Sequence, residues 1–355
     1  MKSVIIVGAG VVGLMCAVRL AKLGARVTVL EAHDENTTVW GPTASASAAG
    51  MLSPLSEQPS AHQALALASF DLWRAWRDGS AWSDAVRFDG AIVAAADAER
   101  SAQVLARAQA ARREAYQLSS GEFRKRSGFA AKVEHAVFLV DEGFAEPLRV
   151  LSGLVMEARA HGVLVHFKQD VLRLTAHAAE TYAGATFEAD LIVLAPGVWA
   201  TEDLMRIAPA LKLVRPAKGC LAPVSIAHPL APNLRGPGFY MVQQANQVAI
   251  GSTMDFDRTD RRVDAAQVET LLAAANALLP GEVQAIPKPW TGIRPMSPDG
   301  WPMIGRSGDV LIAAGHSRNG WLLAPITAEI ITAYVMGAAI PPEWAALSPD
   351  RFGQA

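Results

Sequence analysis

Three glycines near the start of the chain have the spacing of a phosphate-binding turn. Gly8, Gly10 and Gly13 directly follow the apolar run at residues 4–7. Glycines at this spacing allow a sharp turn, let the backbone approach a pyrophosphate and let helix and strand pack closely. Glu31 ends the next apolar run, where a carboxylate can accept hydrogen bonds from a ribose. These residues predict a dinucleotide site, whereas a turn that binds nothing is the weaker interpretation.

An arginine near the other end of the chain stands in apolar surroundings. Arg294 lies between Ile293 and Pro295. A guanidinium removed from water requires an anionic partner. Arg294 is therefore a candidate for binding an anion.

The glycine turn must be positioned by a β-α-β unit. Residues 4–7 predict a buried parallel strand, residues 14–23 a helix that ends at Gly24, and residues 26–30 a second strand. Residues 187–194 and 310–314 are further apolar runs, each followed by a glycine-containing turn. We expect them to join the same sheet from distant parts of the chain.

The pattern changes between residues 215 and 290. Runs at 238–242 and 247–251 predict a hairpin, and residues 265–279 predict a helix. Residues 98–118, rich in Ala, Arg and Gln, predict another helix. The fold class is therefore α/β: a Rossmann-like nucleotide domain with a second, mostly antiparallel sheet.

A tract of small residues at positions 41–50 has two interpretations. Its composition is that of a flexible linker. Small side chains also let backbone lie against a flat ring, and the tract comes soon after the nucleotide-binding unit. Contact with a cofactor is at least as well supported.

Composition excludes several classes of protein. The 355 residues carry 32 Lys and Arg against 34 Asp and Glu, a net charge of −2, so no basic surface for nucleic acid is indicated. Two cysteines, Cys16 and Cys220, make neither a disulfide framework nor a zinc site, and no metal is expected.

The glycines in the first apolar run argue against a signal peptide. Pro325 and Glu329 argue against a membrane span near the end. We expect a soluble, cytoplasmic protein, and a homo-oligomer is compatible with the sequence.

Several segments at the two ends of the chain together carry a family resemblance. Besides the first glycine motif and Glu31, they have the sequences Ala-Ala-Gly-Met-Leu, Trp-Thr-Gly-Ile-Arg-Pro, Pro-Asp-Gly-Trp-Pro-Met-Ile-Gly and Gly-His-Ser-Arg-Asn-Gly, at residues 48–52, 290–295, 298–305 and 315–320. The chain resembles the FAD-dependent D-amino acid oxidase family, and within it the bacterial glycine oxidases of thiamine biosynthesis.

The resemblance implies a domain organisation and a cofactor. A discontinuous FAD-binding domain would comprise residues 1–80, 141–215 and 291–355, and a substrate-binding domain residues 81–140 and 216–290. Neither cysteine gives a reason for covalent attachment, so we expect non-covalent FAD. The residues implied to bind it are Gly8, Gly10, Val11, Val12, Gly13, Glu31, Ala32, Ala44, Ser45, Ala49, Gly50, Met51, Val171, His316, Ser317, Arg318, Asn319, Gly320, Trp321 and Leu322.

The same resemblance implies four residues at the substrate. Arg294 would bind a carboxylate as an ion pair, and Tyr240 would donate a hydrogen bond to it. Met254 would lie near the flavin, and Arg318 would line the site. Tyr240 and Met254 could instead be packing residues. His316 could act as a general base, although a positioning role is favoured.

The implied reaction is oxidative deamination of a small amino acid or amine such as glycine, sarcosine or a small D-amino acid. Hydride passes to flavin N5, the imine is hydrolysed to a 2-oxo acid and ammonia, and oxygen is the expected acceptor, giving hydrogen peroxide. Three alternatives remain open. They are a flavin dehydrogenase of the same fold that uses a quinone or another acceptor, a nucleotide-binding protein without catalysis and, less well supported, an NAD dehydrogenase.

Overall fold

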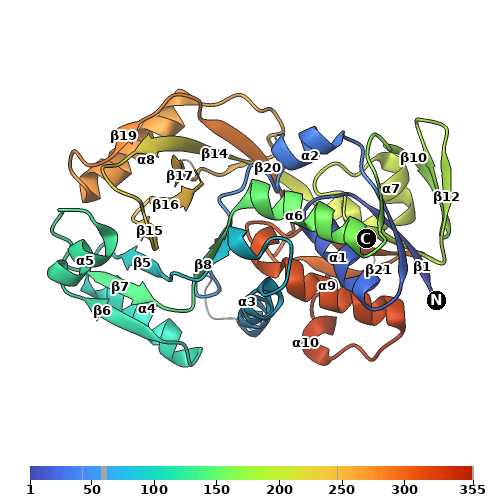
Figure 1. Cartoon of the computed structure of the whole chain (residues 1–355), viewed down its shortest axis with the longest axis horizontal. Coiled ribbons are helices and arrows are strands. Elements are labelled where there is room, and N and C mark those ends of the chain that lie inside the picture. The colour runs from blue at the N-terminus through green and yellow to red at the C-terminus, as the bar shows by residue number, and fades with distance from the viewer. Residues whose placement is uncertain (42, 57–61, 246, 354–355) are drawn as a thin grey trace.

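The computed structural model describes residues 1–41, 43–56, 62–245 and 247–353. Two large sheets lie side by side along the long axis of the molecule (Figure 1). Each is assembled from separated segments of the chain. The mixed α/β fold class predicted from the sequence is confirmed.

The first sheet has six strands in the order β21-β22-β13-β1-β2-β9. β1 pairs in parallel with both β2 and β13, and β13 pairs in parallel with β22. A β-branched, fully apolar run suits such a central strand because both of its faces are covered. The strands are β1 (Ser3–Val7), β2 (Arg26–Leu30), β9 (Leu164–His166), β13 (Leu191–Leu194), β21 (Met303–Ser307) and β22 (Val310–Ala314).

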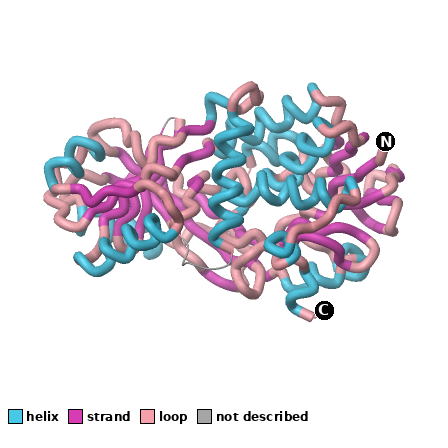
Figure 2. The backbone as a smooth tube through the Cα atoms, turned by 90° about the horizontal axis from the view of Figure 1, so that it is seen from below, coloured by secondary structure: helices cyan, strands magenta, loops and turns pink. Residues whose placement is uncertain are grey.

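Helices cover one face of the first sheet and a small sheet covers the other (Figures 1 and 2). The main helices are α1 (Val11–Lys22), α3 (Gln63–Arg77), α6 (Pro147–Ala160) and α9 (Gly320–Met336). The small sheet consists of β10 (Val171–Leu174), β11 (Ala178–Thr181) and β12 (Thr186–Glu188), with α7 (Glu202–Ile207) beside it. α9 is apolar on nearly all sides because it packs between α1 and α3. Among the described residues, no helix combines the length and apolarity needed to cross a membrane.

The second sheet is mostly antiparallel and has ten strands. Its central path runs β18-β14-β17-β16-β15-β5-β7-β6, and β19 and β20 both pair with β14. The strands are β5 (Ala91–Ala94), β6 (Ala115–Leu118), β7 (Ala136–Leu139), β14 (Arg215–Ser225), β15 (Asn233–Gly236), β16 (Phe239–Gln244), β17 (Gln247–Gly251), β18 (Asp255–Phe256), β19 (Gln284–Ala285) and β20 (Trp290–Met296). Helices α4 (Ala98–Ala110), α5 (Ser120–Ser127) and α8 (Ala265–Leu278) pack around it.

The helix predicted over residues 98–118 is wrong beyond residue 110. α4 ends at Ala110, Arg112 has a positive φ of 53°, and β6 pairs antiparallel with β7. The Arg113 amide donates to the Ala108 carbonyl, which closes the end of the helix. Pairing with a buried strand therefore overrides the helical preference of an Ala- and Gln-rich segment.

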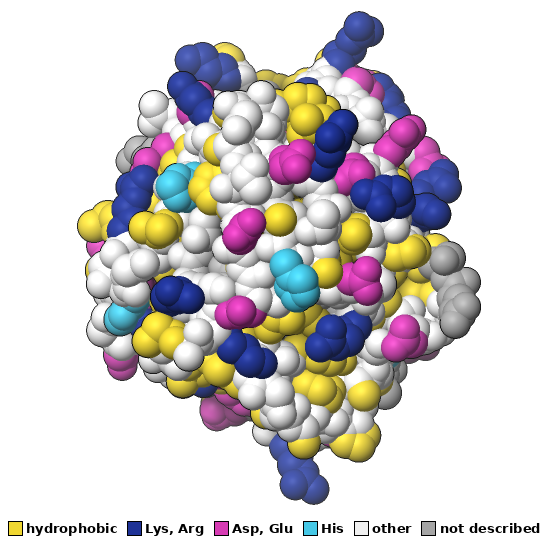
Figure 3. Space-filling view, turned by 90° about the vertical axis from the view of Figure 1, so that its right-hand side faces the viewer, with side chains coloured by type: hydrophobic (Ala, Val, Ile, Leu, Met, Phe, Trp, Pro, Cys, Tyr) yellow, Lys and Arg dark blue, Asp and Glu magenta, His cyan; other side chains and the backbone are white. Residues whose placement is uncertain are grey.

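Several shorter elements lie outside the two large sheets. They include β3 (Met51–Leu52), β4 (Val86–Arg87) and β8 (Gly143–Ala145), which form a three-stranded sheet, and helices α2 (Glu35–Trp40) and α10 (Pro342–Ala345). On the face drawn in Figure 3, basic and acidic side chains are interspersed, as the balanced composition leads one to expect.

Candidate active site

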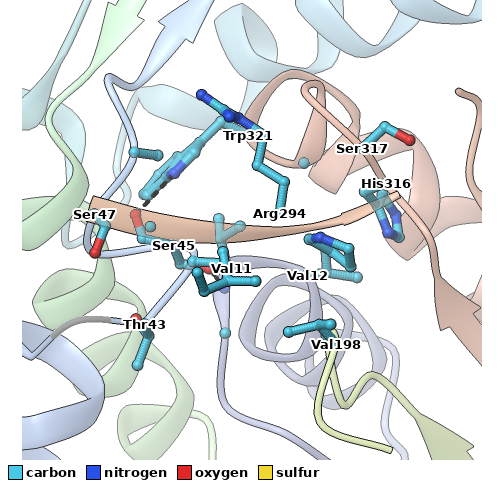
Figure 4. Close-up of a pocket in the computed structure, with 18 of the residues that line it drawn as sticks. Val11, Val12, Thr43, Ser45, Ser47, Val198, Arg294, His316, Ser317 and Trp321 are labelled. Carbon is cyan, nitrogen blue, oxygen red and sulfur yellow. Dashed lines mark hydrogen bonds between the residues drawn. The ribbon is translucent and has the colours of Figure 1, made fainter. Parts of the chain in front are cut away.

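A cavity of about 780 Å³ lies between the two sheets. One of its ends is lined by Glu31 and Val171, and the other is lined by Tyr240 and Arg294. Its volume falls within the usual range for cofactor and ligand pockets. Figure 4 shows Val11 and Val12 of α1 and Arg294 of β20 among the side chains that line it.

The glycine turn leaves no space for side chains. Gly8 has a φ of +109°, and a Cβ atom there would lie 2.3 Å from the Ala195 carbonyl oxygen. A Cβ at Gly13 would lie 2.0 Å from the Gly8 carbonyl oxygen. The glycines therefore serve two purposes: a left-handed turn and direct contact between α1, β1 and the end of β13.

The start of α1 opens into the cavity. The Val11 amide donates to Ser45 Oγ at 3.0 Å, and the helical ladder begins with the Leu14 amide and the Gly10 carbonyl. The amides of Val12 and Gly13 are not used by the helix itself. Unpaired amides and the positive end of the helix dipole make this position suitable for a pyrophosphate.

Glu31 is held in place at the end of β2. Its carboxylate accepts hydrogen bonds from the backbone amides of Ala9, at 2.8 Å, and His33, at 3.1 Å. The side chain is largely buried yet lines the cavity. Because a carboxylate offers about four acceptor positions, it can also accept a hydrogen bond from a ribose hydroxyl.

Two tryptophans anchor the tract of small residues. Trp321 Nε1 donates to the Ser45 carbonyl at 3.1 Å (Figure 4). Trp290 Nε1 donates to the Ser47 carbonyl, also at 3.1 Å. Ala44, Ala49 and several of their neighbours in the tract line the cavity. This arrangement favours cofactor contact over a free linker.

His316 is buried and neutral. Burial lowers its pKa to about 3. Its Nε2 lies 2.9 Å from Thr327 Oγ1, and that hydroxyl donates to the Leu323 carbonyl, so Nε2 carries the proton in this contact. A neutral imidazole tied to α9 favours the positioning role over that of a general base.

Ser317 joins the loop after β22 to β20. Its amide donates to the Pro295 carbonyl at 2.8 Å, and its hydroxyl accepts from the Ser297 amide at 3.2 Å. The loop leads into α9, whose first intrahelical bond is donated by the Leu323 amide to Asn319. A second helix N-terminus therefore faces the cavity, where it can stabilise developing negative charge.

Arg294 extends from β20 over a glycine. A Cβ at Gly219, on β14, would lie 2.2 Å from a guanidinium nitrogen. The guanidinium donates to the Thr253 carbonyl at 3.1 Å and to Ser252 Oγ at 2.8 Å. Among the described residues no carboxylate forms an ion pair with it, and burial lowers its pKa. The observed partners leave its positive charge available to a ligand anion.

Tyr240 approaches the same guanidinium from β16. Its ring lies over Gly251, where an added Cβ would be 2.7 Å from the phenol oxygen. Burial raises the pKa of Tyr240, so the hydroxyl remains a donor at neutral pH. The phenol and guanidinium thus face one site in the cavity.

The structure brings nearly all of the predicted site residues to this cavity. Met254 and Arg318 line it together with Tyr240 and Arg294, as does every residue named for FAD binding except one. Leu322, in the first turn of α9, instead packs in the hydrophobic core, and its carbonyl accepts a hydrogen bond from Ser69 Oγ.

Sequence reasoning missed Ser252 and Thr253, the residues that hold Arg294 in position. Both line the cavity and follow β17 directly. The signal was a pair of small polar residues at a strand end, immediately before Met254. Their contact with Arg294 depends on β17 and β20 both pairing with β14, although Arg294 lies about 40 residues further along the chain, and the sequence does not reveal these pairings.

The described residues fit FAD in their donor chemistry. The N-terminus of α1 suits the phosphates, the N-terminus of α9 suits the flavin, and Glu31 suits the ribose. The glycine turn leaves room for the pyrophosphate. Cys16 and Cys220 are both buried and neither lines the cavity. Within the described ranges, no cluster of three or more His, Cys, Asp or Glu side chains could hold a metal.

Comparison with known proteins identifies a family. Residues 3–334 match the family model described as DAO, FAD dependent oxidoreductase. The chain is 31% identical to glycine oxidase of Bacillus licheniformis, over 96% of this chain and 94% of that protein. It is 29% identical to the bifunctional protein ThiO/ThiG of Synechocystis, over 99% of this chain and 54% of that longer protein.

A solved structure supports the same relationship. The crystal structure of glycine oxidase from Geobacillus kaustophilus superposes with a TM-score of 0.85 at 28% identity, covering 99% of both chains. The similarity therefore includes both large sheets.

Proposed function

The chain belongs to the DAO family of FAD-dependent oxidoreductases and binds FAD, and from this we propose that it oxidises glycine, sarcosine or a small D-amino acid. Oxygen is the proposed electron acceptor. Glycine or a D-amino acid, with oxygen and water, would then give a 2-oxo acid, ammonia and hydrogen peroxide, and sarcosine would release methylamine in place of ammonia. The names of the relatives support this substrate class.

Arg294 is the single observation that carries the proposal. It is an arginine with no carboxylate partner among the described residues, and it faces a cavity whose other end suits a dinucleotide. An anion is the partner that such a charge requires. The α-carboxylate of an amino acid meets that requirement and fixes the orientation of the molecule.

The proposed roles of the residues follow from their positions. Arg294 binds the carboxylate, Tyr240 donates a second hydrogen bond, and Ser252 with Thr253 holds the guanidinium. Bound FAD would supply the two-electron acceptor for hydride from the α-carbon. Met254 and Arg318 line the same space, and neutral His316 fixes the loop that leads into α9.

We also propose the domain division predicted from the sequence. Residues 1–80, 141–215 and 291–355 would form the FAD-binding domain, and residues 81–140 and 216–290 the substrate-binding domain. The six strands of the first sheet all fall in the former. β20 also falls almost wholly in it, although it pairs with β14 of the second sheet, so the division passes through that sheet.

Anaerobic reduction of the bound flavin tests the function. We expect glycine, sarcosine or D-alanine to bleach the flavin absorbance, and air to restore it with release of peroxide. Slow reoxidation without peroxide would indicate a dehydrogenase that uses another acceptor. If none of these substrates bleaches the flavin, the proposed substrate class is wrong.

A further inference from the structure

A second arginine stands directly beside Tyr240. Arg235 on β15 is the cross-strand partner of Tyr240 on β16, so both side chains project from the same face of the sheet. Both line the cavity. On the other side, Tyr240 pairs with Gly251, which Ser252 follows. Arg235 and the Arg294 site therefore flank Tyr240 from opposite sides.

A fully buried glutamate fixes the position and charge of Arg235. Arg235 Nη2 donates to Glu142 Oε1 at 2.8 Å, and the Glu142 side chain has no exposed surface. Burial raises the pKa of Glu142, and the charges of Arg235 and Arg107 offset only part of that rise. The pair brings donors to the cavity wall with no net charge, in contrast to the unpaired charge of Arg294.

The hydroxyl of Ser53 completes this part of the wall. Ser53 follows β3 and is 7% exposed, lines the cavity and lies close to Glu142. Within the described part of the chain, Arg235 Nε has no hydrogen-bond partner, and the Ser53 hydroxyl interacts only with the Glu142 side chain. Buried polar atoms without partners are costly, so an oxygen of a ligand bound here would be stabilising.

We propose that Arg235, Glu142 and Ser53 form a second subsite, which binds a neutral oxygen on the side chain of the substrate. The preferred substrates are then amino acids that carry a hydroxyl or a carboxamide beyond the α-carbon. A neutral oxygen fits better than a second carboxylate, because Glu142 already compensates the charge of Arg235. The inference rests on the proposed function, since Arg294 and Tyr240 must hold the α-carboxylate.

Pairs of matched substrates test this preference in the FAD-loaded protein. We expect D-serine to reduce the flavin with a kcat/KM about fivefold above that of D-alanine, the effect of one neutral hydrogen bond. D-asparagine should likewise exceed D-aspartate, which has the same shape and an added charge. Equal or lower values for D-serine would overturn the subsite, as would reduction by glycine alone.

Binding of unreactive carboxylates gives a readout that is independent of turnover. Perturbation of the flavin spectrum should show 3-hydroxypropionate binding more tightly than propionate. Equal affinities would overturn the subsite. If neither compound binds and no amino acid bleaches the flavin, it is the proposed function that fails.

Variants connect the preference to these residues. Ser53→Ala should bring the D-serine to D-alanine ratio close to one. Ser56→Ala is the matched control, because that hydroxyl also lies on the cavity wall but already donates to the Ser53 carbonyl at 2.9 Å.

Removing Arg235 alone leaves Glu142 buried without a partner and endangers folding. The double variant Arg235→Gln/Glu142→Gln avoids this and should also abolish the preference. An unchanged ratio in Ser53→Ala and in the double variant, or an equal loss in Ser56→Ala, would contradict the assignment.

Discussion

The proposed nucleotide end of the cavity is built mainly from backbone groups, whereas the proposed substrate end is built from side chains. At the first, glycines, helix amides and Glu31 come from one continuous β-α-β unit. At the second, Arg294, Tyr240 and Ser252 come from β20, β16 and the end of β17, and β14 supplies the glycine beneath the guanidinium. The first end should therefore be sensitive to any added atom, and the second to loss of particular charges and donors.

A methyl group in the glycine turn should have the largest effect. Gly8→Ala would place Cβ against the Ala195 carbonyl oxygen and strain a positive φ. We expect a loss of about 3 kcal/mol or more in stability together with loss of bound flavin. Thermal unfolding and the flavin-to-protein ratio measure both effects.

Gly24→Ala is the control for this change. Gly24 also has a positive φ, of +85°, but nothing lies within 4 Å of an added Cβ. We expect the cost of backbone strain alone, about 1 kcal/mol, with flavin retained. If Gly8→Ala and Gly24→Ala lose the same stability and the same amount of bound flavin, the contact of Gly8 with the end of β13 is unimportant.

Loss of the positive charge of Arg294 should have the next largest effect. Arg294→Gln should weaken substrate affinity about 100-fold or more, the usual range for a buried charged contact, while FAD remains bound. Arg173→Gln, an exposed change on β10, should have no effect. The measurement is flavin reduction as a function of substrate concentration. Wild-type kinetics in Arg294→Gln would mean that the carboxylate binds elsewhere.

His316 should make stability depend on pH. Its pKa in the fold is about 3, below the value near 6.5 expected after unfolding. The stabilisation is therefore complete above pH 6.5 and is lost as the pH falls towards 3. Between pH 6.5 and 5 the loss from this residue should be about 2 kcal/mol.

Urea unfolding at the two pH values measures this difference. In His316→Gln, the loss of unfolding free energy between pH 6.5 and 5 should be smaller by this contribution. His161→Gln, at an exposed position, should show the same loss as the wild type. An identical pH dependence of stability in wild type and His316→Gln would contradict a buried, neutral imidazole.

The smallest effect is expected from a single hydroxyl. Tyr240→Phe should weaken substrate affinity by about 1 kcal/mol, or roughly fivefold. Because burial raises the pKa of Tyr240, the wild-type affinity should not decline up to the normal tyrosine range near pH 10. A titration that shows a loss near pH 8 would argue against the phenol as a donor.

The difference between the two ends also explains what could be predicted from the sequence. The β-α-β unit is local, so glycine spacing and apolar runs were sufficient to place Gly8, Gly13 and Glu31. Arg294 was recognisable from its apolar neighbours. Its contacts with Ser252 and Thr253 were not, because they depend on strand register between distant segments. The strand at residues 115–118 was missed for the same reason.

A structure of the FAD-loaded protein with bound acetate tests the central claim most directly. We expect the acetate carboxylate between the Arg294 guanidinium and the Tyr240 hydroxyl, with the adenosine end of FAD at Glu31 and the flavin beside the start of α9. Acetate bound away from Arg294, or a dinucleotide in the opposite orientation, would contradict the arrangement of one cavity with a nucleotide end and a substrate end.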